Sequence, residues 1–473
     1  MKKIALPMLL AAVILACAWY VSARATGIAH HPSPIHVPNP APVKPITLSN
    51  GSLAMSVSTN NPNILQNSDG KMILQIDLEA VRAEIQGHKP LNIALVIDRS
   101  GSMAERGKLE YARKAAQELV DRLGKNDRLA VIIYDDVAEV LVPSTKVKDR
   151  EWIKEKIAGI TERGATNLAE GLALGYSQLR EYLDREAINQ VIILSDGLAN
   201  RGITGKGDIQ RMVSNWREEG VSVTALGLGM DFNEDLMMGI ANASGGHYNF
   251  IESPDQLAGI YEKELNTLMA TVGKDVKIVI NTAEGVKLDD VYGYDAKIAG
   301  SEIEIPLGAF DGGQHRIIVA HLSAPTSALG KKDVAQVRLD YRDMLSDSKK
   351  VTTIAKVDVI CVADMARVEE KRNLAVEGNS YWLGNSRENT TAIQAIEGGR
   401  KDDAVRWYER KVQEIRAQNA PIQSPQLESQ AKQYENDLSN LKKIDNLQDG
   451  RGKVMVKKGK ELQRLQSLGY ISQ

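Results

Sequence analysis

Residues 90–270 constrain the fold most, because continuous apolar runs alternate there with amphipathic stretches. A run that is apolar at every position is typical of a strand buried on both faces, as in a parallel sheet covered by helices. We therefore predict an α/β fold over 89–270, a doubly wound, mostly parallel, Rossmann-like sheet. A further run at 137–142 follows its predecessor so closely that we expect an antiparallel edge hairpin. The apolar runs are 93–97, 129–134, 191–194 and 221–228.

The flanking segments 46–88 and 271–362 have a different pattern, in which apolar and polar residues alternate. Met72, Leu74, Ile76 and Leu78 are an example. Alternation with period two is typical of half-buried antiparallel strands. Because the two flanks share this pattern, we hypothesise that they form one β-sandwich into which the α/β domain is inserted. The hypothesis requires contacts between 46–88 and 271–362.

The C-terminal region, 363–473, is polar and has helical periodicity. We expect a helical hairpin from 374–396 and 404–415, and a short coiled-coil-like seam over 427–441. A basic stretch follows. We interpret it as a solvated helix face, with contact to anionic lipid or glycan as the alternative. Its members are Arg451, Lys453, Lys457, Lys458 and Lys460.

The N-terminal segment, 1–25, indicates the cellular compartment. Lys2 and Lys3 precede an apolar run that ends near Ala23 and Ala25. This pattern is compatible with a cleaved signal peptide, with a retained membrane anchor, or with a lipoprotein modified at Cys17. All three predict an exported protein of the periplasm or cell envelope. Residues 26–45 are rich in proline and are expected to form an extended linker.

Composition narrows the functional classes. The 473 residues are 43% hydrophobic and 25% charged, with a formal net charge of −2. These values are those of a soluble globular protein and predict no general attraction to nucleic acid. The two cysteines provide no disulfide framework. Binding must therefore be sought in a local site.

Polar oxygens gather where predicted strands end. Asp98 closes the run LNIALVID and is followed by Ser100 and Ser102, while Asp196 follows 191–194 and Thr166 lies in a turn before a predicted helix. The carboxyl ends of the strands in a doubly wound sheet form its ligand-binding edge. Carboxylate and hydroxyl oxygens suit a hard cation such as Mg²⁺.

The motifs DRSGSM, GATNL and LSDG resemble the metal-ion-dependent adhesion site of the von Willebrand factor A family. The resemblance implies that Asp98, Ser100, Ser102, Thr166 and Asp196 hold Mg²⁺, or Mn²⁺ or Ca²⁺ in its place. It also implies that an acidic side chain of a partner completes the coordination. The arrangement with flanks is similar to bacterial A-domain proteins often labelled chloride-channel-like, a label that implies no pore here.

Each motif alone has a simpler interpretation. Ser100, Ser102 or Thr166 could cap a helix, and Asp196 could belong to a turn with Gly197. A phosphate-binding loop is not supported, since Gly101 and Gly107 are too far apart for that motif. The chain lacks a G-x-S-x-G elbow, an H-E-x-x-H motif and a cysteine pair, so we expect no enzyme activity.

We therefore expect an adhesion-type, metal-dependent protein-binding module whose cation bridges to an acidic partner residue. The N-terminal segment could attach it to a membrane. The alternative is a structural component of an envelope assembly, in which the metal stabilises the fold and the C-terminal helices bind partners. The loop side chains expected to set specificity are Arg99, Met103, Asn167, Leu198 and Asn200.

Overall fold

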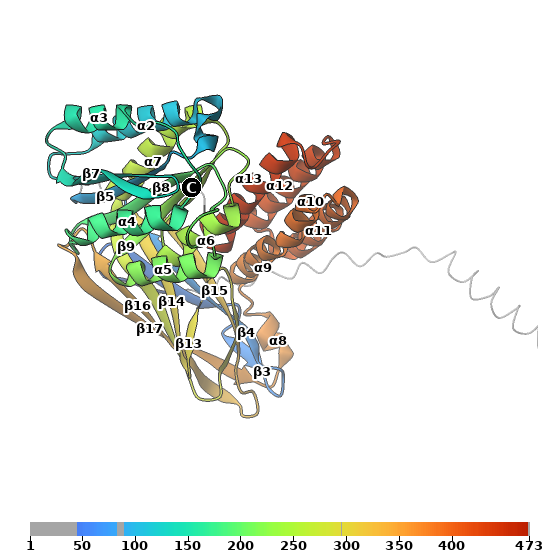
Figure 1. Cartoon of the computed structure of the whole chain (residues 1–473). Helices are drawn as coiled ribbons and strands as arrows, with labels where there is room; N and C mark the ends of the chain where they lie inside the picture. Colours follow the sequence, from blue (N-terminus) through green and yellow to red (C-terminus); the bar gives the residue numbers. More distant parts are fainter. Residues whose placement is uncertain (1–44, 83–88, 295, 472–473) are drawn as a thin grey trace, which may run out of the picture. The chain divides into compact units, whose positions relative to one another are not determined.

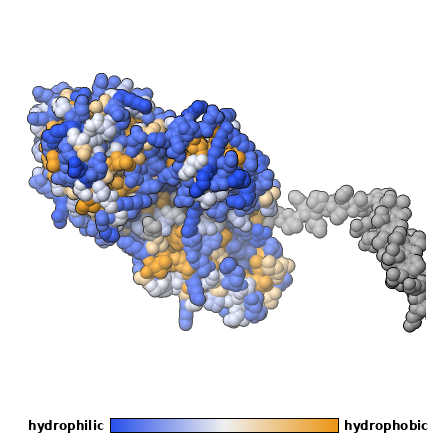
Figure 2. All heavy atoms as spheres, turned by 45° about the vertical axis from the view of Figure 1, so that its right-hand side comes forward, coloured by the Kyte–Doolittle hydropathy of each residue, from blue (hydrophilic) through white to orange (hydrophobic). Residues whose placement is uncertain are grey.

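The computed structural model describes residues 45–82, 89–294 and 296–471. The predicted export segment 1–25, with Cys17, and nearly all of the 26–45 linker lie outside the described residues. Within the described ranges, no helix is long and apolar enough to span a membrane. Hydrophilic residues dominate the face shown in Figure 2, and the hydrophobic residues form scattered patches among them.

The central sheet has six strands in the order β10-β9-β8-β5-β6-β7. All neighbours are parallel except β6 and β7, which form the antiparallel edge hairpin expected from the sequence. The predicted doubly wound fold is confirmed. The strands are β5 (Leu91–Asp98), β6 (Arg128–Tyr134), β7 (Ala138–Lys146), β8 (Ile188–Ser195), β9 (Val221–Leu228) and β10 (Tyr248–Ile251).

Helices cover both faces of this sheet (Figure 1). In β5, Ile93 and Leu95 pack into one layer while Ala94 and Val96 pack into the other, which explains why every position of the strand from Ile93 to Ile97 is apolar. Two short 3₁₀ helices, η1 (Gly101–Gly107) and η2 (Pro254–Gln256), precede α2 and α7. One layer contains α2 (Lys108–Arg122), α3 (Arg150–Ala158) and α7 (Leu257–Met269), and the other contains α4 (Leu168–Arg180), α5 (Lys206–Glu218) and α6 (Glu234–Ser244).

Two further sheets are built from the flanking segments, in the orders β1-β2-β4-β15-β12 and β13-β14-β11-β16-β17-β3. The strands before the central domain are β1 (Ile46–Ser49), β2 (Leu53–Thr59), β3 (Asn63–Leu65) and β4 (Lys71–Ala80). Those after it are β11 (Thr271–Thr282), β12 (Lys287–Val291), β13 (Lys297–Ala299), β14 (Glu302–Asp311), β15 (His315–Ser323), β16 (Gly330–Asp343) and β17 (Lys349–Val362).

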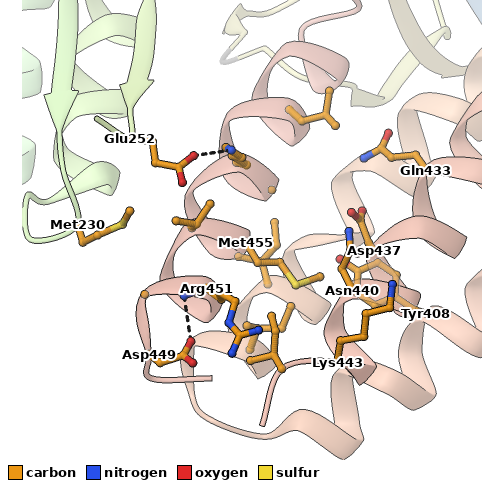
Figure 3. Close-up of a pocket in the computed structure, with 18 of the residues that line it drawn as sticks. Met230, Glu252, Tyr408, Gln433, Asp437, Asn440, Lys443, Asp449, Arg451 and Met455 are labelled. Atoms are coloured by element: carbon orange, nitrogen blue, oxygen red, sulfur yellow. Dashed lines mark hydrogen bonds and ion pairs between the residues drawn. The ribbon is translucent and has the colours of Figure 1, made fainter. Parts of the chain in front are cut away.

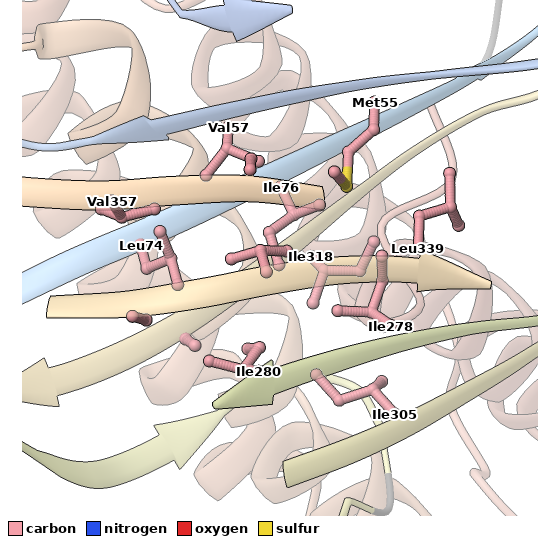
Figure 4. Packing of buried hydrophobic residues seen from close by; sticks show 14 of the residues in the cluster. Met55, Val57, Leu74, Ile76, Ile278, Ile280, Ile305, Ile318, Leu339 and Val357 are labelled. Carbon is pink, nitrogen blue, oxygen red and sulfur yellow. The ribbon is translucent and has the colours of Figure 1, made fainter. Parts of the chain in front are cut away.

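Strands from the two flanks share both sheets. Leu74 of β4 pairs with Ala320 of β15, and Ile64 of β3 pairs with Cys361 of β17. These are the contacts that the insertion hypothesis requires. The short edge strand β3 runs parallel to β17, unlike the antiparallel strands expected there. The inward-facing apolar residues of the two sheets form one cluster, of which Figure 4 labels ten.

The C-terminal region contains more helices than the predicted hairpin. The expected helix over 374–396 is interrupted at Asn389, where the Thr390 hydroxyl donates a hydrogen bond to the Arg387 carbonyl at 2.9 Å. Such side-chain bonds compete with the helical backbone. The helices are α8 (Met365–Glu369), α9 (Leu374–Glu388), α10 (Thr390–Glu397), α11 (Lys401–Ile422), α12 (Pro425–Lys442) and α13 (Gly450–Ser467).

The basic stretch lies on α13, where Arg451, Lys453 and Lys458 are exposed as expected. The expectation of a solvated face is wrong for Lys457 and Lys460. The Lys457 ammonium is ion-paired with Glu234 and lies 3.9 Å from the centre of the Phe232 ring, and only 4% of its side chain is exposed. The Lys460 ammonium lies 3.1 Å from a Glu234 oxygen and 3.0 Å from an Asp235 oxygen. The sequence periodicity could not show this, because the acidic partners lie more than 200 residues earlier in the chain.

Candidate metal site

The five predicted residues come from three segments at the carboxyl edge of the central sheet. Asp98 ends β5, and Ser100 and Ser102 follow it; Asp196 follows β8; Thr166 precedes α4. Asp98, Ser100, Thr166 and Asp196 are buried, and Ser102 is half-buried. Parallel β5 and β8 are direct neighbours, which places the Asp98 and Asp196 loops side by side.

Asp98 is a fully buried carboxylate held by neutral donors. One of its oxygens accepts a hydrogen bond from the Ser100 backbone N–H at 2.9 Å. The other accepts from the hydroxyls of Ser195, at 3.0 Å, and Tyr134, at 3.2 Å. Burial raises the pKa of Asp98 to about 6, and the negative charge of Asp196 adds to this increase. The site thus contains a buried acid whose hydrogen-bond donors carry no positive charge.

The serine hydroxyls connect the two acidic loops. The Ser100 and Ser102 hydroxyl oxygens are 3.1 Å apart, and the Ser102 hydroxyl donates to Asp196 Oδ1 at 2.7 Å. The second oxygen of Asp196 accepts a hydrogen bond from Lys108 Nζ at 2.6 Å. The hydroxyl and carboxylate oxygens therefore lie within one hydrogen-bonded group.

Thr166 faces the same group across Gly197. A Cβ atom built on Gly197 would lie 3.4 Å from Thr166 Oγ1 and 3.6 Å from Ser102 Oγ, so both hydroxyls border the space above this glycine. The Thr166 backbone is fixed by Asn200, whose side chain accepts from the Thr166 N–H at 2.9 Å. The structure thus brings all five predicted residues together.

The helix-cap interpretations of these hydroxyls are wrong. Ser100 precedes η1, but its side chain makes no capping hydrogen bond. The N-cap of α4 is Asn167, whose side chain accepts from the Glu170 N–H, and not Thr166. Both hydroxyls are therefore available for a ligand.

Besides Asn167, which caps α4, two more of the residues expected to set specificity have other roles. Arg99 is buried and its guanidinium lies 2.7 Å from Asp135, which also binds Arg163. Met103 is completely buried in the layer of α2, α3 and α7. Adjacency in sequence to the predicted metal ligands did not predict the positions of these two side chains, because neighbouring side chains in a tight loop can point in opposite directions. Leu198, by contrast, is 57% exposed.

Three residues at the site were not predicted: Lys108, Tyr134 and Ser195. Ser195 immediately precedes Asp196, so the sequence contained a signal for it. Tyr134 ends β6 and had a weaker signal as the last residue of an apolar run. Lys108 had none, because its partner Asp196 lies 88 residues later.

A second feature is a cavity of about 850 Å³ lined mainly by the C-terminal helices (Figure 3). Its polar lining includes Asp437 and Asp449 as well as Lys443 and Arg451. Burial raises the pKa of Asp437 to about 6. Because the lining contains both signs of charge, it does not select an anionic or a cationic ligand.

His247 lies next to a buried carboxylate. Its Nδ1 lies 3.2 Å from the buried carboxylate of Glu264, which in turn accepts a hydrogen bond from the Thr224 hydroxyl. Within the described residues, no three His, Cys, Asp or Glu side chains cluster as a metal-binding group. A cation at the sheet edge would therefore need hydroxyl oxygens in addition to the two carboxylates.

The fold and its loops define a class of protein. Residues 92–263 match the family model of the von Willebrand factor type A domain, and the chain contains a domain of this family. The fold continues beyond that domain: the structure of "von Willebrand factor type A from Catenulispora acidiphila" matches 90% of this chain and all of its own with a TM-score of 0.69, at 16% identity.

Relatives found by sequence match this chain over only part of its length. The chain is 27% identical to sll0103 of Synechocystis sp. over 341 residues, which are 69% of this chain and 79% of sll0103. It is 28% identical to YfbK of Escherichia coli over 214 residues, 45% of this chain and 37% of YfbK. The chain thus spans little more than a third of YfbK.

Proposed function

We propose that the A domain binds a divalent cation through Asp98, Ser100, Ser102, Thr166 and Asp196, and that this cation bridges to an acidic side chain of a protein partner. The observation that carries the proposal is the environment of Asp98. It is a fully buried carboxylate with neutral donors, it is close to a second carboxylate, and three hydroxyls lie around the pair. A cation is the missing charge in such a group.

The donor set fits Mg²⁺, and Mn²⁺ or Ca²⁺ by the same chemistry. Carboxylate and hydroxyl oxygens are hard ligands, which these ions prefer. Gly197 contributes by having no side chain, because a Cβ there would occupy space next to Thr166 and Ser102. When bound, the ion supplies a positive charge that attracts a carboxylate.

The surface next to the candidate site suits a protein partner. Leu198 and Ile203, on the segment after Asp196, are 57% and 53% exposed. Apolar side chains beside a charged centre are typical of protein interfaces. We propose that Leu198 and Asn200 contact the partner. We also propose that the protein works outside the cytoplasm, in the cell envelope; the N-terminal sequence pattern supports this.

Thermal unfolding tests ion binding. An ion at 100 times its dissociation constant stabilises the folded protein by about 2.7 kcal/mol. We expect Mg²⁺ or Mn²⁺ to raise the melting temperature relative to EDTA, and Asp98→Ala to abolish the increase. Asp340→Ala is the control, because Asp340 is a carboxylate of the distant strand β16. A wild-type protein whose melting temperature is the same with ion and with EDTA would contradict the proposal.

Partner capture tests the bridge. We expect pull-down of a partner from envelope extract to be lost in EDTA and with Asp98→Ala, but kept with Asp340→Ala. A structural role is the second candidate, supported by the ion pairs that join α13 to the A domain. Capture that persists in EDTA and with Asp98→Ala would favour it.

A further inference from the structure

Lys108 reaches the candidate site from beneath the loop that contains the two serines. It is the first residue of α2 and follows Arg106 and Gly107, whose φ angles of 53° and 69° are both left-handed. This turn directs the Lys108 side chain back toward β8. Its ammonium lies 2.6 Å from Asp196 Oδ2 and 3.4 Å from the Ser102 carbonyl oxygen.

The ion pair of Lys108 and Asp196 is enclosed. Their side chains are 9% and 0% exposed. On the other side, Gly229 directly follows β9, and a Cβ built on it would be in ordinary van der Waals contact with Lys108 Cε, at 3.7 Å. Charges in such an environment are screened far less than surface charges. Lys108 therefore affects every other charge at the site.

The two carboxylates differ in whether a positive charge is paired with them. Asp196 is paired: Lys108 binds one oxygen and Ser102 donates to the other. Asp98 has only neutral donors. With the two carboxylates and the lysine ionised, the group has one net negative charge, and a bound divalent cation would leave it with one net positive charge. Without Lys108 the same complex would be neutral.

We infer that Lys108 is a specificity-determining residue that weakens ion binding and strengthens the binding of the incoming carboxylate. The inference rests on the proposed function. The lysine repels the ion, but it leaves the occupied site with a positive charge that an acidic ligand can neutralise. Its interaction with the ion and its interaction with the ligand therefore have opposite signs.

The test is a charge series measured with Mn²⁺ and acetate as probes. Calorimetry gives the Mn²⁺ affinity, and the relaxation of water protons reports acetate when it displaces water from bound Mn²⁺. For Lys108→Met, which keeps the length of the side chain without its charge, we expect Mn²⁺ to bind about tenfold more tightly and acetate about tenfold more weakly. Lys108→Arg should remain near the wild type in both.

A second variant changes the charge of the site in the opposite direction. Asp196→Asn removes one negative charge, so acetate should bind the Mn²⁺-loaded protein more tightly than it binds the wild type. Lys108→Met combined with Asp196→Asn restores the wild-type net charge and should return the acetate affinity toward the wild-type value. Lys114→Met is the control, because Lys114 is an exposed lysine of the same helix. Circular dichroism checks that each variant is folded.

The outcomes separate this inference from the proposed function. If the wild type binds no Mn²⁺, the proposed function fails. If Mn²⁺ binds but Lys108→Met lowers both affinities, or changes neither, Lys108 only supports the loop and the inference is overturned. If Lys108→Met does not fold, Asp196→Asn decides: tighter acetate binding supports the inference, and unchanged or weaker binding overturns it.

Discussion

Two acidic regions of the A domain differ in how their charge is compensated. The candidate metal site contains Asp98 and Asp196, and its lysine, Lys108, is paired with Asp196 alone. The second region is an acidic patch on the segments after β9 and β10, and each of its carboxylates is ion-paired with a lysine of α13. The acidic patch consists of Asp231, Glu234, Asp235 and Glu252.

The difference shows why similar side chains have different roles. In the acidic patch, the C-terminal helix supplies the cations, so the carboxylates hold α13 against the A domain. At the candidate metal site, no residue in the described part of the chain supplies a cation for Asp98, so a buried negative charge is left for an ion. The acids paired with α13 hold two parts of the chain together, whereas the unpaired Asp98 is a candidate ligand.

The largest effect on the unfolding free energy is expected when an ion pair between the acidic patch and α13 is removed. Lys457→Met leaves Glu234, which is 11% exposed, without its most buried partner. Removing one member of a buried ion pair costs about 3–5 kcal/mol of unfolding free energy. Urea denaturation should show this loss with and without ion, and the Mn²⁺ affinity should not change. Lys458→Met is the matched control, because its pair with Glu252 is exposed and should contribute at most about 1 kcal/mol. Equal losses for the two variants would contradict the comparison.

At the candidate metal site, the unpaired charge of Asp98 should make the unfolding free energy depend on pH. The pKa of Asp98 is raised from 3.8 to about 6, so the folded protein holds the proton more tightly than the unfolded chain does. The stability that Asp98 contributes is therefore greatest below pH 4 and is lost as the pH rises through 6. In EDTA, we expect the unfolding free energy of the wild type to fall by about 3 kcal/mol relative to Asp98→Asn between pH 4 and pH 7. Urea denaturation across this range measures it, and a constant difference between the two proteins would count against an uncompensated Asp98.

A smaller loss of stabilisation by the ion is expected when an uncharged member of the candidate site is replaced. Thr166→Val removes one hydroxyl and keeps the shape of the side chain. If ion affinity falls tenfold, an ion concentration that stabilises the wild type by about 2.7 kcal/mol would stabilise the variant by about 1.4 kcal/mol. Thermal unfolding with Mg²⁺ and with EDTA gives both values. Thr353→Val in β17 is the control, since it is also a buried threonine; an equal loss in both would remove Thr166 from the site.

The smallest effect is expected next to the site. Asn167 caps α4, so Asn167→Ala should cost about 1 kcal/mol of unfolding free energy. Because Asn167 is a cap in this structure rather than a ligand, calorimetry should give the same Mn²⁺ affinity for the variant and the wild type. A large loss of ion affinity would mean that the edge of the site extends beyond Thr166.

Much of the fold and of the candidate site could be predicted from local sequence. A strand buried on both faces must be apolar at nearly every position, so the runs at 93–97 and 191–194 identified β5 and β8. The residue after such a run lies at the sheet edge, which is why Asp98 and Asp196 could be placed side by side. The alternating flanks indicated the sandwich strands for a similar reason. The helix break at Asn389 depends on a local side-chain contact, and the parallel direction of β3 depends on its pairing with the distant strand β17. Neither was predictable from periodicity.

What the sequence by itself determined is therefore which oxygens reach the sheet edge. Only the tertiary structure decided which of them are already paired. Lys108 binds Asp196 across 88 residues, and Lys457 binds Glu234 across 223. The tertiary structure also directs the side chains of Arg99 and Met103 away from the site. Charge compensation acts through space over a few ångströms, whereas sequence patterns report only neighbours along the chain, so the unpaired state of Asp98 became visible only in the folded protein.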